Sequence, residues 1–157
     1  MESESLFDAV LDGALREIAA KQLPVYTFAL YHDHESEAVS VCVDTEENSA
    51  KAASAINRYN RGYFSQAVAN GDLMSARLWQ ANIGRSLSLG DFALVNVART
   101  PLPAGAFSPD FYLSMVRSVM SVERRVAMLS PHPERLLFAC SGPDAEVSYV
   151  WSALSYG

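Results

Sequence analysis

The chain has 157 residues, of which half are hydrophobic and 19% are charged, a composition typical of one globular domain and too apolar for a disordered chain. Its formal net charge of −6 disfavours a general nucleic-acid binder, because such proteins present basic surfaces to phosphates. No apolar run approaches the roughly 20 residues that a membrane-spanning helix needs. We therefore expect one soluble domain over residues 1–157, with neither nucleic acid nor membrane as its partner.

The first five residues and the two cysteines bear on localisation. Residues 1–5 are acidic, whereas a secretory leader begins with basic residues. Cys42 and Cys140 both fall in predicted strands, and free thiols are what a reducing compartment favours. A disulfide between them would need adjacent strands of suitable geometry. We expect a cytoplasmic protein with free cysteines.

The chain begins with a predicted helix and hairpin. Apolar residues at spacings of three and four predict a helix over residues 3–22, which Pro24 ends. Strands are predicted at residues 25–31 and 38–43, and the polar connection His32–Glu37 is too long for a two-residue turn. Because both faces of the first strand are apolar, we expect it to be central in a sheet.

A second, longer helix is predicted over residues 46–69. Asp44 or Thr45 is its expected N-cap, and Asn70-Gly71 is a typical C-terminal stop. The residues at helical spacing predict a buried stripe made of Ala53, Ile56, Tyr59, Tyr63 and Ala67.

The second half is harder to interpret. In residues 72–105, a strand is possible at 75–79, and the short apolar run at 92–98 fits either a strand or a buried helix. Ser108-Pro109-Asp110 then predicts the start of a helix that ends before Pro131. Strands are predicted at residues 136–140 and 146–152. The whole predicts an α+β fold: a largely antiparallel sheet packed against three main helices.

The stretch from His32 to Glu35 is the nearest approach to a metal site. Two histidines at positions i and i+2 of a strand point the same way and could share a divalent cation, with a carboxylate as third ligand. That would suit a metal-dependent hydrolase. In a loop, the same residues form a solvated polar connection, which is the interpretation we favour.

Other candidates for chemistry are weaker. Cys42 and His132 could be a nucleophile and its base, but nothing in the sequence brings them together. Residues 84–86 do not match a phosphate-binding loop. Basic side chains on the last long helix are expected to form a solvated face balanced by Glu123: Arg117, Arg124 and Arg125. We therefore expect a protein without catalytic residues, metal or cofactor.

Acidic residues gather at both ends of the second predicted strand. One group, in the hairpin connection, is Asp33, Glu35 and Glu37. The other, at the start of the second helix, is Asp44, Glu46 and Glu47. Each could attract a basic protein partner, although solubility and helix capping also explain such residues. Since a strand separates the groups, we expect two small patches.

Several of these segments resemble a family of uncharacterised bacterial domains. In that family a Tyr-x-Phe-Ala-Leu-Tyr strand, matched by residues 26–31, precedes a strand ending in Asn-Thr-Glu-Glu, where this chain has Asp44 to Glu47. A tryptophan-containing stretch in the middle is similar to residues 77–79, and a serine after an aromatic residue is similar to Trp151-Ser152. Some members of the family are found beside secreted bacterial toxins.

The resemblance implies an immunity protein that binds and blocks a toxin, and it brings no catalytic residues. We expect a binding protein rather than an enzyme, with a basic surface on its partner. The expected contacts are three acids at the tip of the hairpin and one aromatic anchor: Asp33, Glu35, Glu37 and Trp79. A metal-dependent hydrolase and a self-associating regulatory module remain the alternatives.

Overall fold

The computed structural model describes residues 3–153; residues 1–2, part of the acidic N-terminal stretch, and residues 154–157 lie outside the described residues. The helices are α1 (Ser3–Lys21), α2 (Glu46–Ala69), α3 (Leu73–Ala76), α4 (Phe111–Ser121) and α5 (Glu123–Ala127). The strands are β1 (Thr27–Asp33), β2 (Ala38–Asp44), β3 (Leu94–Pro101), β4 (Leu137–Cys140) and β5 (Tyr149–Ser152). Three short 3-10 turns are η1 (Arg77–Trp79), η2 (Leu89–Asp91) and η3 (Pro133–Arg135).

The strands form one sheet in the order β3-β2-β1-β4-β5. Only the β1–β4 pair is parallel among the described strands, and the other pairs are antiparallel. Strand β1 is central, as its two apolar faces predicted: Phe28 lies opposite Val43 of β2 and Phe138 of β4. The predicted α+β class and largely antiparallel sheet are confirmed.

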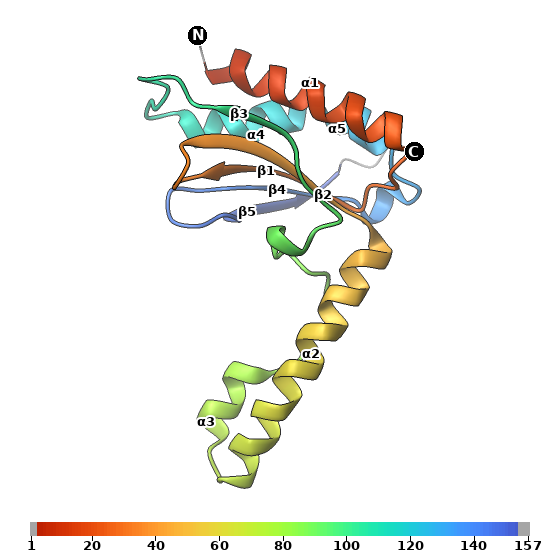
Figure 1. The fold of residues 1–157 in the computed structure, drawn as a ribbon, viewed down its shortest axis with the longest axis vertical. Helices are drawn as coiled ribbons and strands as arrows, with labels where there is room; N and C mark the ends of the chain where they lie inside the picture. Colours follow the sequence, from red (N-terminus) through yellow and green to blue (C-terminus); the bar gives the residue numbers. More distant parts are fainter. Residues whose placement is uncertain (1–2, 154–157) are drawn as a thin grey trace.

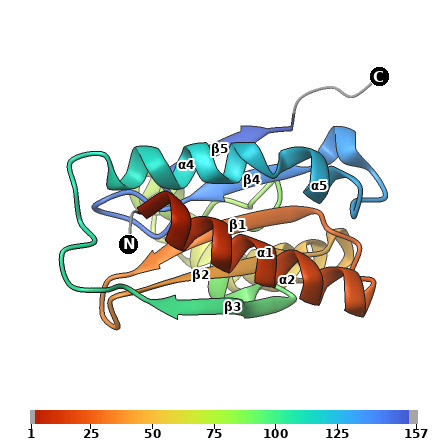
Figure 2. The same ribbon diagram turned by 90° about the horizontal axis from the view of Figure 1, so that it is seen from above.

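One face of the sheet is covered by helices. Figure 2 shows α1 and the α4–α5 pair side by side over it. The apolar residues that predicted α1 are buried there, and Phe7 meets Phe111 of α4 edge to face with ring centroids 5.4 Å apart. Beneath them, Phe28 meets Phe138 in the same manner. This is the main core, and it holds β1 and β4 against the helices.

The opposite face of the sheet is lined by small residues. Ala29, Cys42 and Ala139 lie side by side on β1, β2 and β4 and form a second, smaller cluster with Leu89 and Phe92. No helix packs on this face in the views of Figures 1 and 2, and the cover comes from the η2 segment. Both cysteines are buried and free.

Helix α2 starts just after the end of β2 and projects away from the sheet (Figure 1). Thr45 is its N-cap and accepts a hydrogen bond from the Asn48 N–H, which was one of the two predicted caps. The predicted stop is also confirmed, since Gly71 follows the helix with φ of +71°, a conformation that glycine adopts without steric cost. The predicted buried stripe is confirmed at its two ends, where Ala53 and Ala67 are buried. It is wrong in the middle, where Tyr59 and Tyr63 are exposed, because no sheet lies beneath that part of the helix.

The region from residue 72 to residue 105 differs in part from the sequence prediction. The strand considered at residues 75–79 is instead α3 followed by η1, which turn the chain back along α2. The undecided run at residues 92–98 is β3, paired with β2.

The last long helix breaks at Val122 into α4 and α5. The final strand is shorter than predicted and begins at Tyr149.

The side chain of Asp44 joins three parts of this fold. Its Oδ1 accepts hydrogen bonds from the Thr45 N–H at 2.9 Å, the Asn48 Nδ2 at 2.8 Å and the Ala93 N–H at 3.1 Å. Its Oδ2 is buried without a hydrogen-bond partner among the described residues. Burial raises the pKa of this carboxyl, against the opposing effect of the hydrogen bonds. Oδ1 thus makes all three hydrogen bonds that join these segments, while Oδ2 is desolvated without a compensating hydrogen bond.

We expect Asp44→Ala to lower the free energy of unfolding by about 2 kcal/mol, because it removes the acceptor of three part-buried donors. Asp44→Asn keeps an acceptor oxygen at the same place and removes a buried charge. It should be neutral or stabilising in urea unfolding. The exposed Glu47→Ala is the control and should change stability by less than about 0.5 kcal/mol. Equal losses for the alanine and asparagine variants at position 44 would contradict this assignment.

Candidate functional site

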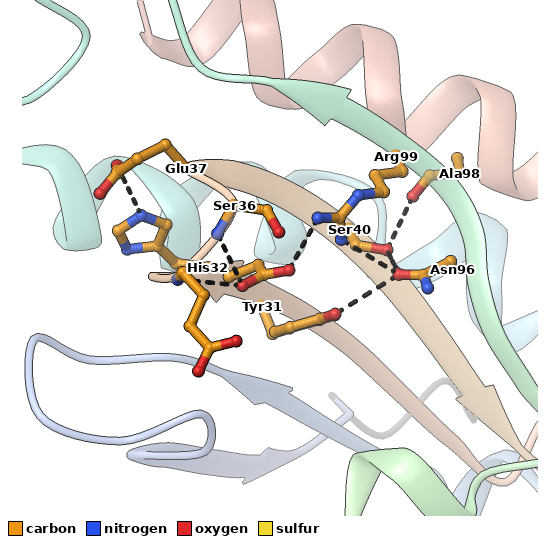
Figure 3. Close-up of polar contacts among 10 residues, drawn as sticks. Tyr31, His32, Ser36, Glu37, Ser40, Asn96, Ala98 and Arg99 are labelled. Atoms are coloured by element: carbon orange, nitrogen blue, oxygen red, sulfur yellow. Dashed lines mark hydrogen bonds and ion pairs between the residues drawn. The ribbon is translucent and has the colours of Figure 1, made fainter.

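The predicted acidic residues of the hairpin do not play equal parts. Asp33 lies at the end of β1, and its Oδ1 accepts the backbone N–H groups of Glu35 and Ser36 at 3.1 and 3.2 Å. Its Oδ2 lies 2.7 Å from a guanidinium nitrogen of Arg99 (Figure 3). The Arg99 hydrogen bond, helped by Ser36, lowers the pKa of Asp33 to about 2. This acid shapes the turn, and its charge is already paired.

Arg99 is itself held by a polar group on the sheet. The amide oxygen of Asn96 accepts from the Ser40 hydroxyl at 2.6 Å and lies 3.4 Å from both the Tyr31 hydroxyl and an Arg99 nitrogen. Asn96 has φ of +57°, and the β2–β3 register shifts at this point, so the bulge turns its side chain onto the sheet. The hairpin is therefore fastened along β3 (Figure 3).

His32 is buried, although the sequence placed it in a solvated connection. Strand β1 extends two residues further than predicted and carries this side chain into the helix-covered side. Its Nδ1 lies 3.0 Å from the Tyr112 hydroxyl, and its backbone N–H donates to the Ser141 hydroxyl at 2.9 Å. The ring also packs on His34 and Phe107, with centroids 4.1 and 5.0 Å away. His32 is buried because β1 stays paired with β2 as far as Asp33, and the length of this pairing could not be predicted from the sequence.

Glu37 completes this arrangement from the turn. Its backbone has φ of +48°, and one carboxylate oxygen lies 3.5 Å from His32 Nε2, at the limit of hydrogen-bond range. Burial, followed by the charge of His34, lowers the pKa of His32, while Glu37 and Asp33 act in the opposite direction. Most of the Glu37 side chain is in solvent. The carboxylate is thus available to a partner while its backbone is fixed.

Aromatic side chains surround the acids at this end of the sheet. Tyr112 is half-buried, and its pKa is raised first by burial and then by repulsion from the carboxylates of Glu37 and Asp144 and from the ionised form of Tyr149, all of which lie within electrostatic range of it. Phe107 and Tyr149 are each about half exposed. We call this surface the acidic end and define it as Glu35, Glu37, Phe107, Tyr112, Asp144 and Tyr149. Only its two glutamates were among the predicted contacts.

Trp79 does not belong to the acidic end. It lies in η1, on the projecting part of the chain, and its ring stacks on Tyr63 with centroids 4.5 Å apart and an interplanar angle of 22°. Tyr59 meets the same indole edge to face. Because α2 begins at the opposite end of β2 from the hairpin turn, the predicted contacts fall on two separate surfaces (Figure 1).

The remaining sequence candidates are structural. Cys42 is buried, burial raises its pKa, and the ion pair of His132 is with Glu134. Arg85 donates to the Tyr26 carbonyl and to the hydroxyl of Thr27, the first residue of β1, and lies over the Tyr26 ring at 3.6 Å. These contacts tie residues 84–86 to the start of β1. Glu123, expected on a solvated face, is buried. In residues 3–153, no three His, Cys, Asp or Glu side chains gather as a metal ion would require.

Comparisons with known proteins return no match: no family model, curated protein or solved structure corresponds to this chain. Among the described helices, none is both long and apolar enough to cross a bilayer.

We expect the stability of the fold to decrease as the pH falls below about 6.5, because the folded-state pKa of His32 is lower than the ordinary value. Between the folded-state and the unfolded-state pKa of His32, the unfolded chain binds a proton that the folded chain does not bind. A falling pH therefore favours the unfolded state. Urea titrations between about pH 5 and about pH 8 measure the effect. His32→Gln should reduce this pH dependence, whereas the exposed His132→Gln should keep it. Identical pH profiles for wild type and His32→Gln would refute the assignment.

Proposed function

We propose that this protein is a cytoplasmic immunity-type inhibitor, which binds a bacterial toxin and covers its active site or substrate groove. The observation that carries the proposal is the acidic end, where exposed carboxylates stand beside half-exposed aromatic rings. Aromatic side chains are enriched in protein interfaces, and a negative patch speeds association with a basic partner. The toxin class follows from the family resemblance of residues 26–31 and 44–47.

Rigidity supports a binding role for this surface. Asp33 fixes the turn through its hydrogen bonds, and Arg99 holds Asp33 from the neighbouring strand. The backbone that carries Glu35 and Glu37 therefore loses little conformational freedom on binding. The backbone of the following loop is also attached, since the Leu102 N–H donates to the Glu37 carbonyl at 2.8 Å. A preorganised tip of this kind is typical of inhibitors that act by occlusion.

The experiment begins with capture of the partner from the cell that makes the protein, followed by purification of both chains. Isothermal titration calorimetry then gives affinity and stoichiometry. Co-expression of the captured protein with and without the inhibitor tests neutralisation of its toxicity. A tight one-to-one complex that suppresses toxicity is the expected result. A captured protein that is harmless when expressed alone would remove the immunity assignment.

Reversing the two solvent-facing glutamates, Glu35→Lys with Glu37→Lys, should weaken the complex by at least about tenfold, mostly through a slower association rate. Asp33 is left in place, because it holds the turn. The control variant Glu17→Lys with Glu47→Lys makes the same change in net charge on exposed acids of α1 and α2, and it should bind like wild type. Equal affinities for both double variants would exclude the acidic end from the interface.

A further inference from the structure

The projecting part of the chain leaves an unusual amount of apolar surface uncovered. We call residues 51–83 the arm; it contains most of α2, together with α3, η1 and the segment that returns toward the sheet (Figure 1). Eight of the fifteen exposed large hydrophobic side chains among the described residues lie on these 33 residues. The most exposed are Leu73, Met74, Leu78 and Ile83, each at least 70% exposed. Such a patch marks an interaction surface.

The arm also contains a groove. It runs between α2 and the returning segment, encloses about 950 Å³, and has Phe64, Trp79 and Ile83 among its apolar walls. Arg58 and Arg61 lie along the same groove and carry positive charge. A segment that fills it would bury apolar atoms and bring a negative charge to the two arginines.

Charge distinguishes the arm from the rest of the molecule. It carries Lys51, Arg58, Arg61 and Arg77 against Asp72 alone, a net charge of +3. Since the whole chain has a net charge of −6, the remaining residues carry −9. We call the residues outside the arm the body. The arm is therefore complementary in charge to the body of a second copy of the chain, and electrostatic attraction of this type steers association.

The body offers a surface that the arm could cover. In residues 3–153, the sheet face opposite α1 is covered by the η2 segment and not by a helix, and its outer part leaves Val150 exposed and Tyr31 and Val147 half-buried. Glu146 is close enough to Cys42 on this face to raise the pKa of that thiol. Figure 1 shows the arm projecting on this same side of the sheet, so that arm and sheet make an open angle.

The chain exposes more surface than a compact monomer of its mass should, as it would if part of that surface were buried in a complex. Its accessible surface is 9055 Å², whereas a compact monomer of 17.1 kDa is expected to expose about 7,750 Å². The excess is on the order of 1,000 Å², and each partner contributes about 800 Å² to a standard interface. One additional chain of similar shape is enough to account for it.

We propose that two copies of this chain form a symmetric dimer in which the basic, apolar arm of each lies against the open sheet face of the other. The contact is isologous: each copy supplies one arm and one sheet face, and two equivalent contacts close the pair. The inference is separate from the proposed function, because the acidic end lies at the hairpin turn and takes no part in this contact.

Sedimentation equilibrium and light scattering of the full chain, from low micromolar to near-millimolar concentration, test the dimer. The expected mass is twice 17.1 kDa, with dissociation promoted by added salt because the contact pairs opposite charges. Leu78→Asp with Ile83→Asp should raise the dissociation constant by at least about 100-fold. Val150→Asp on the receiving face should act in the same direction.

The controls separate a lost interface from a lost fold. Met128→Asp changes an equally exposed apolar residue on the body, outside both proposed surfaces, and should stay dimeric. Circular dichroism should be unchanged in the arm variant, whose two substituted side chains are largely in solvent. Urea unfolding should give the same stability for both chains at concentrations where both are monomeric, because association adds stability to the wild type only above its dissociation constant. Charge reversal by Arg58→Glu should weaken the dimer, and adding Glu146→Lys should restore part of the loss.

A wild-type chain that stays monomeric over the whole concentration range would overturn the proposal. A dimer that survives Leu78→Asp with Ile83→Asp would show that the arm is not the contact, and one that survives Val150→Asp would overturn the reciprocal arrangement. The variant Glu35→Lys with Glu37→Lys should remain dimeric while losing its partner, so the two proposals fail independently.

Discussion

The carboxylate of Asp44 is the point on which the shape of the molecule depends. It stands where β2 ends and α2 begins, and it also accepts a hydrogen bond from the chain as it returns into β3. Asn48 strengthens the same junction by donating to the Asp91 carbonyl at 2.7 Å. Because a single buried oxygen fixes three segments, the direction of the arm and the cover over the small-residue sheet face are set together. The surrounding burial makes the interaction hard to replace by water.

The protein has two surfaces of opposite charge, at the two ends of β2. Strand β2 separates them: the hairpin turn and its carboxylates lie at one end, and the arm with its arginines starts at the other. The polar contacts around Asn96 and Arg99 keep the hairpin in place along β3, while the stack of Trp79 on Tyr63 keeps the outer arm folded back on itself. In the two proposals, the acidic end meets a basic partner and the arm meets the acidic part of a second copy of the chain.

Buried polar groups show where sequence interpretation fails. His32 was expected in solvent because its neighbours are charged, yet it is the inward-facing residue of an extended β1 and contacts Tyr112, which is 80 residues away. No local pattern indicates that contact. The same holds for Asp144 and Tyr149, which reach the acidic end through a strand that pairs with β4. In each case the partner is brought near by sheet register rather than by spacing along the chain.

The sequence by itself determined the elements whose side chains repeat with a clear period. The helical spacing of α1, the two-sided apolar character of β1 and the capping signals around α2 predicted those elements correctly, because local propensity and core burial agree there. Tertiary structure alone decided the rest: that α2 leaves the sheet, that residues 75–79 turn back as helix, and that the run after residue 92 pairs with β2. Periodicity reports which face of an element is apolar, but it carries no information on what covers that face. The outer half of α2 is covered by α3 and η1 in place of a sheet: Ala67 is buried, while Tyr59 and Tyr63, which were expected in a core, are exposed.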